Sequence, residues 1–457
     1  MSQQSGLPRP PAYVHFVGVG GIGMSGLARI LAAWGYRVTG SDAFPSNLVE
    51  QLQSEGIDVQ IGHEDTAHAA AADLIVATAA VRPTNSEIHA AKERGTPVIK
   101  RAELLGMLAN ARTCVAVAGS HGKSTTSGML VTALQAVGRD PSYAVGAVVG
   151  STGTNAAPGS GEAMVVEADE YDYSFLWLKP AFAIITNIDY DHPDLFPDQS
   201  TYDRAFVRFV QGMRPESVLV VNGDDPGVRR VIERFRALRV RVLTYGAGPG
   251  NDWRIDGTTV TGPDERTIEL VLSVPGIHNR ANATAALVVM HEMGIDLEEA
   301  ADALGTYRGI GRRFDVKGEA DGITVIDDYA HHPQEIAATV AAARERYPGR
   351  RIVAAFQPHT YSRTKALLDP FAQALGAADC AVVLDIYPAR ETDSLGVSSD
   401  DIIRRMNSET TMAGGTPAQA VDRLALEARD GDVILTLGAG DVTLVGPKLL
   451  ALLKEQS

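Results

Sequence analysis

Short apolar runs rich in β-branched residues alternate with Ala- and Leu-rich segments along almost the whole chain. The run YVHFVGVG, for example, precedes GMSGLARILAAWG, and DLIVATAA precedes NSEIHAAKERG. The short apolar runs are typical of buried strands, and the longer segments have the spacing of helices. The alternation therefore predicts an α/β fold built on mainly parallel sheets.

The chain of 457 residues is too long for one ordinary hydrophobic core, and its length favours about three domains. Similar strand-then-helix openings occur near residues 13, 114 and 323. We expect domains over residues 1–106, 107–314 and 315–457. Residues 246–276 break the pattern with alternating residues and turn dipeptides, which predicts an antiparallel hairpin inserted in the middle domain.

Composition restricts the partners. The formal net charge of −15 argues against nucleic acid, because binding a polyanion needs clustered Lys and Arg. No segment reaches the roughly 18 apolar residues of a membrane span, and the N-terminal MSQQSGLPRPPAY lacks a signal-peptide pattern.

Cys114 and Cys380 lie in apolar runs and predict buried thiols without a disulfide. We expect a cytoplasmic protein with no membrane partner.

The first glycine cluster lies in HFVGVGGIGMSG, where Gly18, Gly20 and Gly23 have the spacing G-x-G-x-x-G between a strand and a helix. Asp42 ends the next predicted strand. Glycines at these positions let backbone N–H groups approach a pyrophosphate, and the carboxylate suits ribose hydroxyls. NAD, FAD and a UDP-sugar all fit this pattern, and tight strand–helix packing alone would also explain the glycines.

A second glycine cluster follows a strand in VAVAGSHGKSTTSGML. Its core consists of Gly119, Ser120, His121, Gly122, Lys123, Ser124 and Thr125. The usual phosphate-loop pattern has glycine where this chain has Val117, so the loop is a shortened variant. Lys123 can still reach the β- and γ-phosphates, and the Ser124 hydroxyl suits Mg²⁺. The cluster predicts that the protein binds ATP.

Two later apolar runs end in acidic clusters, as expected of strands at a metal-binding edge of a parallel sheet. The first, MVVEADEYDYSF, contains Glu167, Asp169 and Glu170. The second, AIITNIDYDHPDLF, contains Asn187, Asp189, Asp191 and His192. Acidic residues at strand ends can also be solvated loop residues, but two clusters after a phosphate loop favour a metal site.

Eight ordered segments resemble the Mur ligases of peptidoglycan synthesis, and the resemblance covers residues 13 to 445. The segments are HFVGVGGIGMSGLA, GSHGKSTT, EADEYDYSF, NIDYDHPDLF, PGIHNRANATAA, GRRFD, DDYAHHPQEI and FQPHTYSRT. The resemblance implies a Rossmann-like N-terminal domain for a UDP-sugar, a central P-loop ATPase domain and a Rossmann-like C-terminal domain that closes over the site. It is strongest to the branch that joins L-alanine to UDP-N-acetylmuramate with ATP and Mg²⁺, acting as a monomer or homodimer.

The resemblance also assigns roles to residues at matching positions. Besides the loop from Gly119 to Thr125, the implied ATP-binding residues are His278, Asn279, Asn282, Arg313 and Asp328. The implied UDP-sugar residues are Gly18, Gly20, Gly21, Ile22, Gly23, Asp42, His331, His359, Tyr361 and Arg363. The implied Mg²⁺ ligands are Ser124, Glu167 and His192, and the implied catalytic residues are Lys123, His192 and His332.

Departures from the family pattern are small. Ser120, Ser124 and Ser127 stand where threonine is more usual, and each keeps its hydroxyl. Several family members use a carbamylated lysine after the region of His192, but this chain has no lysine between Lys179 and Lys317. That absence is expected of the alanine-adding branch.

Three alternatives remain open. A ligase that recycles a ready-made tripeptide onto the same UDP-sugar shares both glycine clusters, but generally differs where this chain has FQPHTYSRT. An NAD-dependent oxidoreductase would explain only the first cluster. A non-catalytic nucleotide switch would leave the acidic clusters and the histidines near residue 331 without a role.

The chemistry that the resemblance implies needs ATP, because a carboxylate is a poor electrophile. We expect the lactyl carboxylate of the sugar to attack the γ-phosphate, with Lys123 and Mg²⁺ neutralising the charge. The amine of L-alanine then attacks the acyl phosphate, and His192, His331 or His332 is the candidate general base. The segment with Gly309 and Gly311 is a candidate hinge for closure, or a loop held by arginine packing.

Overall fold

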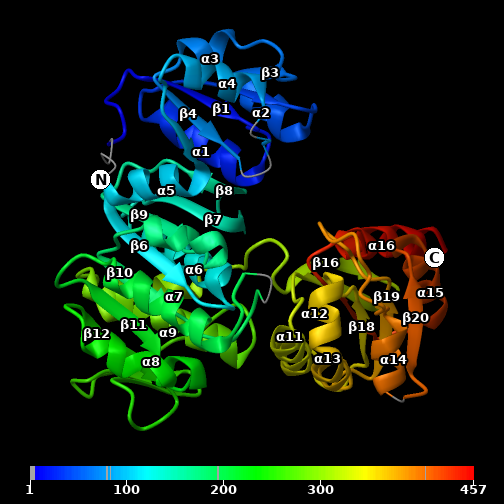
Figure 1. The fold of residues 1–457 in the computed structure, drawn as a ribbon. Helices are drawn as coiled ribbons and strands as arrows, with labels where there is room; N and C mark the ends of the chain where they lie inside the picture. Colours follow the sequence, from blue (N-terminus) through cyan, green and yellow to red (C-terminus); the bar gives the residue numbers. More distant parts are fainter. Residues whose placement is uncertain (1–5, 79–80, 83, 193–194, 407, 457) are drawn as a thin grey trace. The chain divides into compact units, whose positions relative to one another are not determined.

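The computed structural model describes residues 6–78, 81–82, 84–192, 195–406 and 408–456. The chain forms two compact units, which we describe separately (Figure 1). The first unit contains Met1–Leu272 and Ala281–Tyr307, and the second contains Ser273–Arg280 and Arg308–Ser457. In the described part of the chain, no helix is long and apolar enough to cross a membrane.

The first unit begins with a five-stranded parallel sheet in the order β3-β2-β1-β4-β5. This order matches the first five strands of the Rossmann order 3-2-1-4-5-6. The strands are β1 (Tyr13–Val17), β2 (Arg37–Asp42), β3 (Asp58–Ile61), β4 (Leu74–Ala77) and β5 (Val98–Lys100). The helices are α1 (Ile22–Ala33), α2 (Asn47–Ser54), α3 (Ala67–Ala71), α4 (Ser86–Glu93) and α5 (Arg101–Asn110).

A ten-stranded mixed sheet forms the rest of the first unit, in the order β15-β14-β13-β12-β11-β10-β6-β9-β7-β8. Its strands are β6 (Thr113–Ala118), β7 (Ser142–Val149), β8 (Thr154–Ala157), β9 (Ala163–Glu167), β10 (Phe182–Ile185), β11 (Val218–Asn222), β12 (Arg241–Gly246), β13 (Trp253–Asp256), β14 (Thr259–Thr261) and β15 (Thr267–Glu269). The helices are α6 (Lys123–Ala136), the 3₁₀ segment η1 (Tyr171–Trp177), α7 (Gln199–Gln211), α8 (Pro226–Arg236), α9 (Ile277–Glu292), whose first residues belong to the second unit, and α10 (Leu297–Gly305).

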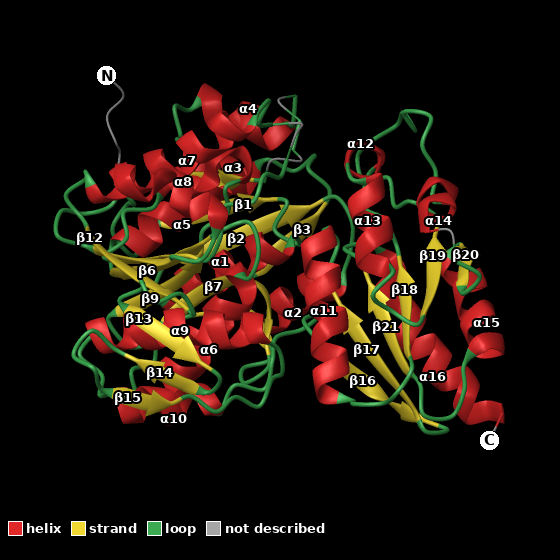
Figure 2. Cartoon of the chain, turned by 90° about the horizontal axis from the view of Figure 1, so that it is seen from below, coloured by secondary structure: helices red, strands yellow, loops and turns green. Residues whose placement is uncertain are grey.

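The second unit has a six-stranded sheet in the order β16-β17-β21-β18-β19-β20, parallel except for the edge pair β16–β17. The strands are β16 (Asp315–Ala320), β17 (Ile323–Asp328), β18 (Ile352–Phe356), β19 (Cys380–Leu384), β20 (Thr411–Gly415) and β21 (Val433–Leu437). The helices are α11 (Pro333–Arg346), α12 (Tyr361–Ala366), α13 (Leu368–Leu375), α14 (Asp400–Met406), α15 (Pro417–Glu427), the 3₁₀ segment η2 (Asp441–Leu444) and α16 (Val445–Gln456). Helices cover both faces of this sheet, α11, α13 and α14 on one and α15 and α16 on the other (Figure 2).

The predicted α/β class with mainly parallel sheets is confirmed, and each sheet lies within one predicted domain range. The domain boundaries themselves stay a prediction. Residues 246–276 form the predicted antiparallel pairing, but as three strands that continue the edge of the central sheet through β12 and β13. Cys114 and Cys380 are buried free thiols, as predicted, and burial raises the pKa of Cys114 to about 12.

Candidate active site

The second glycine cluster forms a tight loop between β6 and α6. Gly119 has φ of +135° and Gly122 has φ of +80°, conformations that favour glycine. A Cβ at Gly119 would overlap Thr186 Oγ1, and one at Gly122 would lie 3.0 Å from Asn282 Oδ1. The loop leads directly into the N-terminus of the 14-residue helix α6, where backbone N–H groups and the helix dipole favour an anion.

The residues that follow β10 hold this loop in place. Ser120 Oγ donates to the carbonyl of Asp189 at 2.7 Å, and the N–H of His121 donates to Asn187 Oδ1 at 2.8 Å. Thr186 Oγ1 donates to the carbonyl of His121 at 2.6 Å. Because β10 pairs with β6 in the sheet, these contacts fix the loop from the neighbouring strand.

Lys123 is the first residue of α6, and its ammonium group is enclosed by the loop. Nζ donates to the carbonyl of Gly119 at 2.6 Å and to Glu170 Oε2 at 2.8 Å. Burial would lower the pKa of Lys123, but the carboxylates of Glu170 and Asp169 outweigh it, and the pKa is raised. Lys123 therefore stays positively charged, and a positive charge is what a residue that binds phosphate needs.

Glu170 is 1% exposed and links the loop to the second acidic cluster. Its Oε1 accepts from the Tyr202 hydroxyl at 3.2 Å and lies 3.6 Å from His192 Nε2. Burial would raise the pKa of Glu170, but Lys123 and His192 outweigh burial, and the pKa is lowered. The structure thus brings His192 against Glu170.

The three predicted Mg²⁺ ligands come from separate elements of the first unit. Glu167 ends β9 beside Val117 of β6, and its Oε2 accepts from the N–H of Gly146 at 2.8 Å. Ser124 is buried in the first turn of α6. The carboxylate and the hydroxyl are oxygen donors of the kind that Mg²⁺ prefers, so this set fits the ion, with the His192 imidazole as the softer donor.

The first glycine cluster also forms a strand-to-helix loop, between β1 and α1. The N–H groups of Gly18 and Val19 donate to the carbonyl of Ser41 at 2.8 and 2.9 Å. Asp42 Oδ2 accepts from the N–H of Gly20 at 2.8 Å, so the carboxylate is bound to the glycine loop itself. Gly21 is the N-cap of α1, and Ile22 and Gly23 form the helix start.

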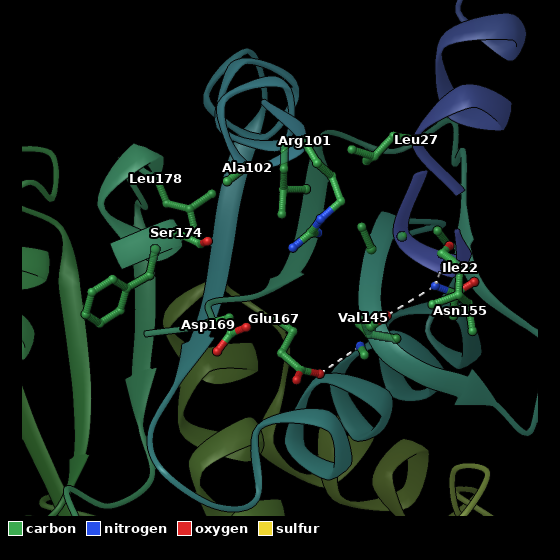
Figure 3. Close-up of a pocket in the computed structure, with 16 residues that line it drawn as sticks. Ile22, Leu27, Arg101, Ala102, Val145, Asn155, Glu167, Asp169, Ser174 and Leu178 are labelled. Atoms are coloured by element: carbon green, nitrogen blue, oxygen red, sulfur yellow. Dashed lines mark hydrogen bonds between the residues drawn. The ribbon is translucent and has the colours of Figure 1, made fainter. Parts of the chain in front are cut away.

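A cavity of about 310 Å³ joins the two halves of the first unit (Figure 3). Ile22 and Gly23 of α1 line one side, together with Arg101 at the start of α5. Glu167 and Asp169 line another side (Figure 3). The first glycine cluster and the candidate Mg²⁺ ligand Glu167 therefore open onto one space, within reach of one elongated molecule.

In the second unit, the carboxyl end of β17 carries a compact polar cluster. Asp328 accepts from the N–H groups of Phe314 at 2.7 Å and Ala330 at 2.8 Å. Burial raises the pKa of Asp328 to about 6, although Arg313 opposes this shift. Arg313 Nη1 lies 3.4 Å from Oε1 of Glu335 in α11.

The histidines of this unit lie at the same edge of its sheet. His331 Nδ1 lies 3.4 Å from Glu335 Oε2, which also accepts from the N–H of His332, the N-cap of α11. The rings of His331 and His359 are 5.9 Å apart, and Arg363 Nη1 lies 3.4 Å from His359 Nδ1.

Tyr361 is the first residue of α12. Its N–H donates to Glu391 Oε2 at 2.5 Å. The structure therefore brings the side chains of His331, His359 and Arg363 together. Tyr361 contacts Glu391 through its backbone N–H.

Three of the predicted ATP-binding residues, His278, Asn279 and Asn282, divide between the two units. Asn282 belongs to the first unit and lies against Gly122. His278 and Asn279 belong to the second, where Asn279 Nδ2 donates to the carbonyl of Pro275 at 2.5 Å. Burial lowers the pKa of His278 to about 4, so this imidazole is neutral.

Three residues at the site have no motif in the sequence. Thr186 and Tyr202 bind the phosphate loop, the latter through Ser120 Oγ at 2.8 Å. Arg101 reaches the cavity from α5. Only the three-dimensional structure brings these side chains to the loops, since each lies far from its partners in the sequence.

Comparison with known proteins agrees with this arrangement. Family models match consecutive parts of the chain: "Mur ligase family, catalytic domain" at residues 13–113, "Mur ligase middle domain" at 117–290 and "Mur ligase, glutamate ligase domain" at 312–440. The UDP-N-acetylmuramate--L-alanine ligase of Clavibacter sepedonicus is 43% identical over 459 residues, covering 98% of this chain and 95% of the relative. The enzyme of that name from Mycobacterium avium is 42% identical over 483 residues, covering 99% of this chain and 97% of the relative.

A solved structure is similar over the same length. The crystal structure of the UDP-N-acetylmuramate-alanine ligase of Thermotoga maritima has a TM-score of 0.79 at 27% identity, covering 98% of this chain and 100% of that one. With two glycine loops, an acidic cluster and relatives above 40% identity over nearly the whole length, this chain belongs to the Mur ligase family.

Proposed function

We propose that this protein is an ATP-dependent ligase that joins L-alanine to the lactyl carboxylate of UDP-N-acetylmuramate, in the synthesis of peptidoglycan precursors. One observation carries the proposal: a phosphate loop lies next to Glu167, and Glu167 faces the same cavity as the first glycine cluster. A sugar nucleotide bound at the cluster would direct its carboxylate toward the γ-phosphate of ATP. The relatives with 42–43% identity carry the same activity in their names.

The residues of the loop have separate tasks in this proposal. The amides from Gly119 to Thr125 bind the ATP phosphates, and Lys123 neutralises the charge that develops on the transferred phosphoryl group. Glu170 keeps the ammonium charged and in place. Ser124, Glu167 and His192 would hold Mg²⁺, which supplies Lewis-acid stabilisation of the phosphoryl oxygens when it is bound.

The second step needs a neutral amine, because an ammonium group has no free electron pair. The amine of L-alanine attacks the acyl phosphate, the C–N bond forms, and phosphate leaves with the oxygen that came from the carboxylate. A nearby base takes the proton from nitrogen, and we assign this role to the pair His331 and His332, because His192 is placed among the Mg²⁺ ligands. We place the reaction in the cytoplasm and expect the protein to act as a monomer or homodimer.

The test is phosphate release from ATP and Mg²⁺ with UDP-N-acetylmuramate and single amino acids. We expect release with L-alanine and little with the tripeptide that a recycling ligase would use. UDP-N-acetylglucosamine is the matched control, since it has the same nucleotide and sugar but lacks the lactyl carboxylate. Equal release with that sugar, or a preference for the tripeptide, would overturn the proposal.

A further inference from the structure

Arg101 places a positive charge on the wall of the cavity that Glu167 and Asp169 also line. It is the first residue of α5, so its backbone lies at the positive end of that helix dipole. Its side chain also reaches the start of α1: a Cβ on Gly23 would lie 3.2 Å from Arg101 Cδ and 3.4 Å from Nη1. The guanidinium group is therefore close to the positive ends of two helices.

Within the described part of the chain, no carboxylate or other polar group forms an ion pair or hydrogen bond with Arg101. Instead the side chain points into the cavity of about 310 Å³ (Figure 3). Glu167 and Asp169 line the same cavity, but Glu167 Oε2 accepts from the N–H of Gly146 and Asp169 Oδ1 accepts from the N–H of Tyr171. A cation near two helix N-termini is electrostatically unfavourable, and a bound anion would reverse the sign of each interaction.

We infer that Arg101 binds the diphosphate of the UDP-sugar and acts as a positioning residue for the substrate. This inference rests on the proposed function, which supplies the sugar nucleotide. The diphosphate is favoured over the lactyl carboxylate because Arg101 contacts the first turn of α1, where the glycine cluster places phosphate. A planar guanidinium with several donors also suits two phosphate oxygens at once.

The position of Arg101 on α5 also links diphosphate binding to the position of the sugar. Arg101 lies on α5, the helix that leads from the last strand of the first sheet to β6, the strand that enters the phosphate loop. A diphosphate held between α1 and Arg101 would fix where the sugar enters the cavity, and hence where its carboxylate lies relative to Glu167. Gly23 leaves room for the Arg101 side chain, because a side chain at position 23 would displace the guanidinium.

The experiment measures the affinities of UDP, uridine and UDP-N-acetylmuramate for the full chain and its Arg101→Ala variant by titration calorimetry. We expect UDP and UDP-N-acetylmuramate to bind about 10- to 100-fold more weakly to the variant, the effect of losing charge-assisted hydrogen bonds. Uridine affinity should not change, since uridine has no phosphate. Arg101→Lys should fall between the parent and the alanine variant, because it keeps the charge but not the planar pair of donors.

Lys100→Ala is the matched control. It removes the same charge one residue away, but Lys100 is 69% exposed and pairs with Asp172 at 3.3 Å. This variant should bind UDP like the parent. Binding of an ATP analogue shows that each variant is folded, because the phosphate loop does not involve either residue.

The outcomes separate the inference from the proposed function. If the parent binds UDP and Arg101→Ala binds it equally well, the inference is wrong, even if the ligase activity is present. A loss for UDP-N-acetylmuramate alone would assign Arg101 to the lactyl carboxylate and would also overturn it. If the parent binds no uridine nucleotide at all, the proposed function itself fails.

Discussion

Gly146 holds the carboxylate of Glu167 in position. It donates its N–H to Glu167 Oε2, and a Cβ at this position would lie 2.7 Å from both carboxylate oxygens. The glycine thus holds the carboxylate by its backbone and leaves room for it. Residues that orient a metal ligand in this way typically affect metal affinity or activity by about 10- to 100-fold.

We therefore expect Gly146→Ala to displace Glu167 and to raise the Mg²⁺ concentration needed for half-maximal phosphate release about 10-fold or more. The measurement is a Mg²⁺ titration at saturating ATP and UDP-N-acetylmuramate. Gly250→Ala is the matched control, because nothing lies within 4 Å of a Cβ there. An unchanged Mg²⁺ requirement in Gly146→Ala would show that Glu167 is not a ligand.

His278 predicts a pH dependence of stability. Burial lowers its pKa to about 4 from the ordinary 6.5, so the folded protein holds the neutral ring while the unfolded chain takes up a proton. Stability from this residue is present above pH 6.5 and is lost as the pH falls toward 4. The loss between pH 7 and pH 4.5 is about 2–3 kcal/mol.

The His278→Asn variant should lack this part of the acid sensitivity. Hydrogen exchange of β17 and β18 in increasing denaturant reports the free energy of unfolding of the second unit at both pH values. His89→Asn is the control, since the His89 side chain is 71% exposed. Equal losses of stability in the parent and the His278 variant would contradict a buried neutral imidazole.

At the scale of elements, α1 and β8 pack closely through two small residues. A Cβ on Gly26 of α1 would lie 2.5 Å from the Cβ of Ala156 in β8. Gly26→Ala should therefore lower the free energy of unfolding of the first unit by about 1–3 kcal/mol through overpacking. The destabilisation should appear although alanine has the better helix propensity.

Ala156→Gly supplies the complementary change. The double variant should recover much of the loss, with a coupling energy of about 0.5–3 kcal/mol in a denaturant-melt cycle. Additive effects would show that α1 does not pack against β8 at this point.

The elements near the glycine clusters were predictable because their signals are local. Gly18, Gly119 and Gly122 have positive φ angles, which favour glycine. A strand followed by glycines and then a helix indicates such a turn within a few residues of sequence. The contacts that hold the loops were not predictable in the same way. Tyr202 lies 82 residues from Ser120, and only the pairing of β10 with β6 and the packing of α7 bring such residues together.

The resemblance to a family predicted most of the remaining candidate site residues, but not their hydrogen-bond partners. A single arginine in KRAELL has no signal of its own, so Arg101 became visible only beside Gly23 and the cavity. The short β15 was equally hard to foresee, since three residues carry too little periodicity to separate a strand from a turn.

For the whole molecule, the proposed function places ATP and the UDP-sugar at different loops of the first unit. Lys123→Ala should abolish phosphate release and the thermal stabilisation by an ATP analogue. It should leave the stabilisation by UDP-N-acetylmuramate nearly unchanged, because we place that ligand at the first glycine cluster. At 100 times the dissociation constant, a ligand adds about 2.7 kcal/mol, which a thermal melt resolves. Loss of both stabilisations would contradict this division.

In the proposed reaction, the phosphate loop holds ATP while its γ-phosphoryl group passes to a sugar carboxylate. The most direct measurement uses UDP-N-acetylmuramate with ¹⁸O in the lactyl carboxylate, and mass analysis of the inorganic phosphate released during one round with L-alanine. We expect phosphate that carries one labelled oxygen, because the P–O bond formed in the first step survives attack by the amine. Phosphate without label, formed together with the alanyl product, would contradict it.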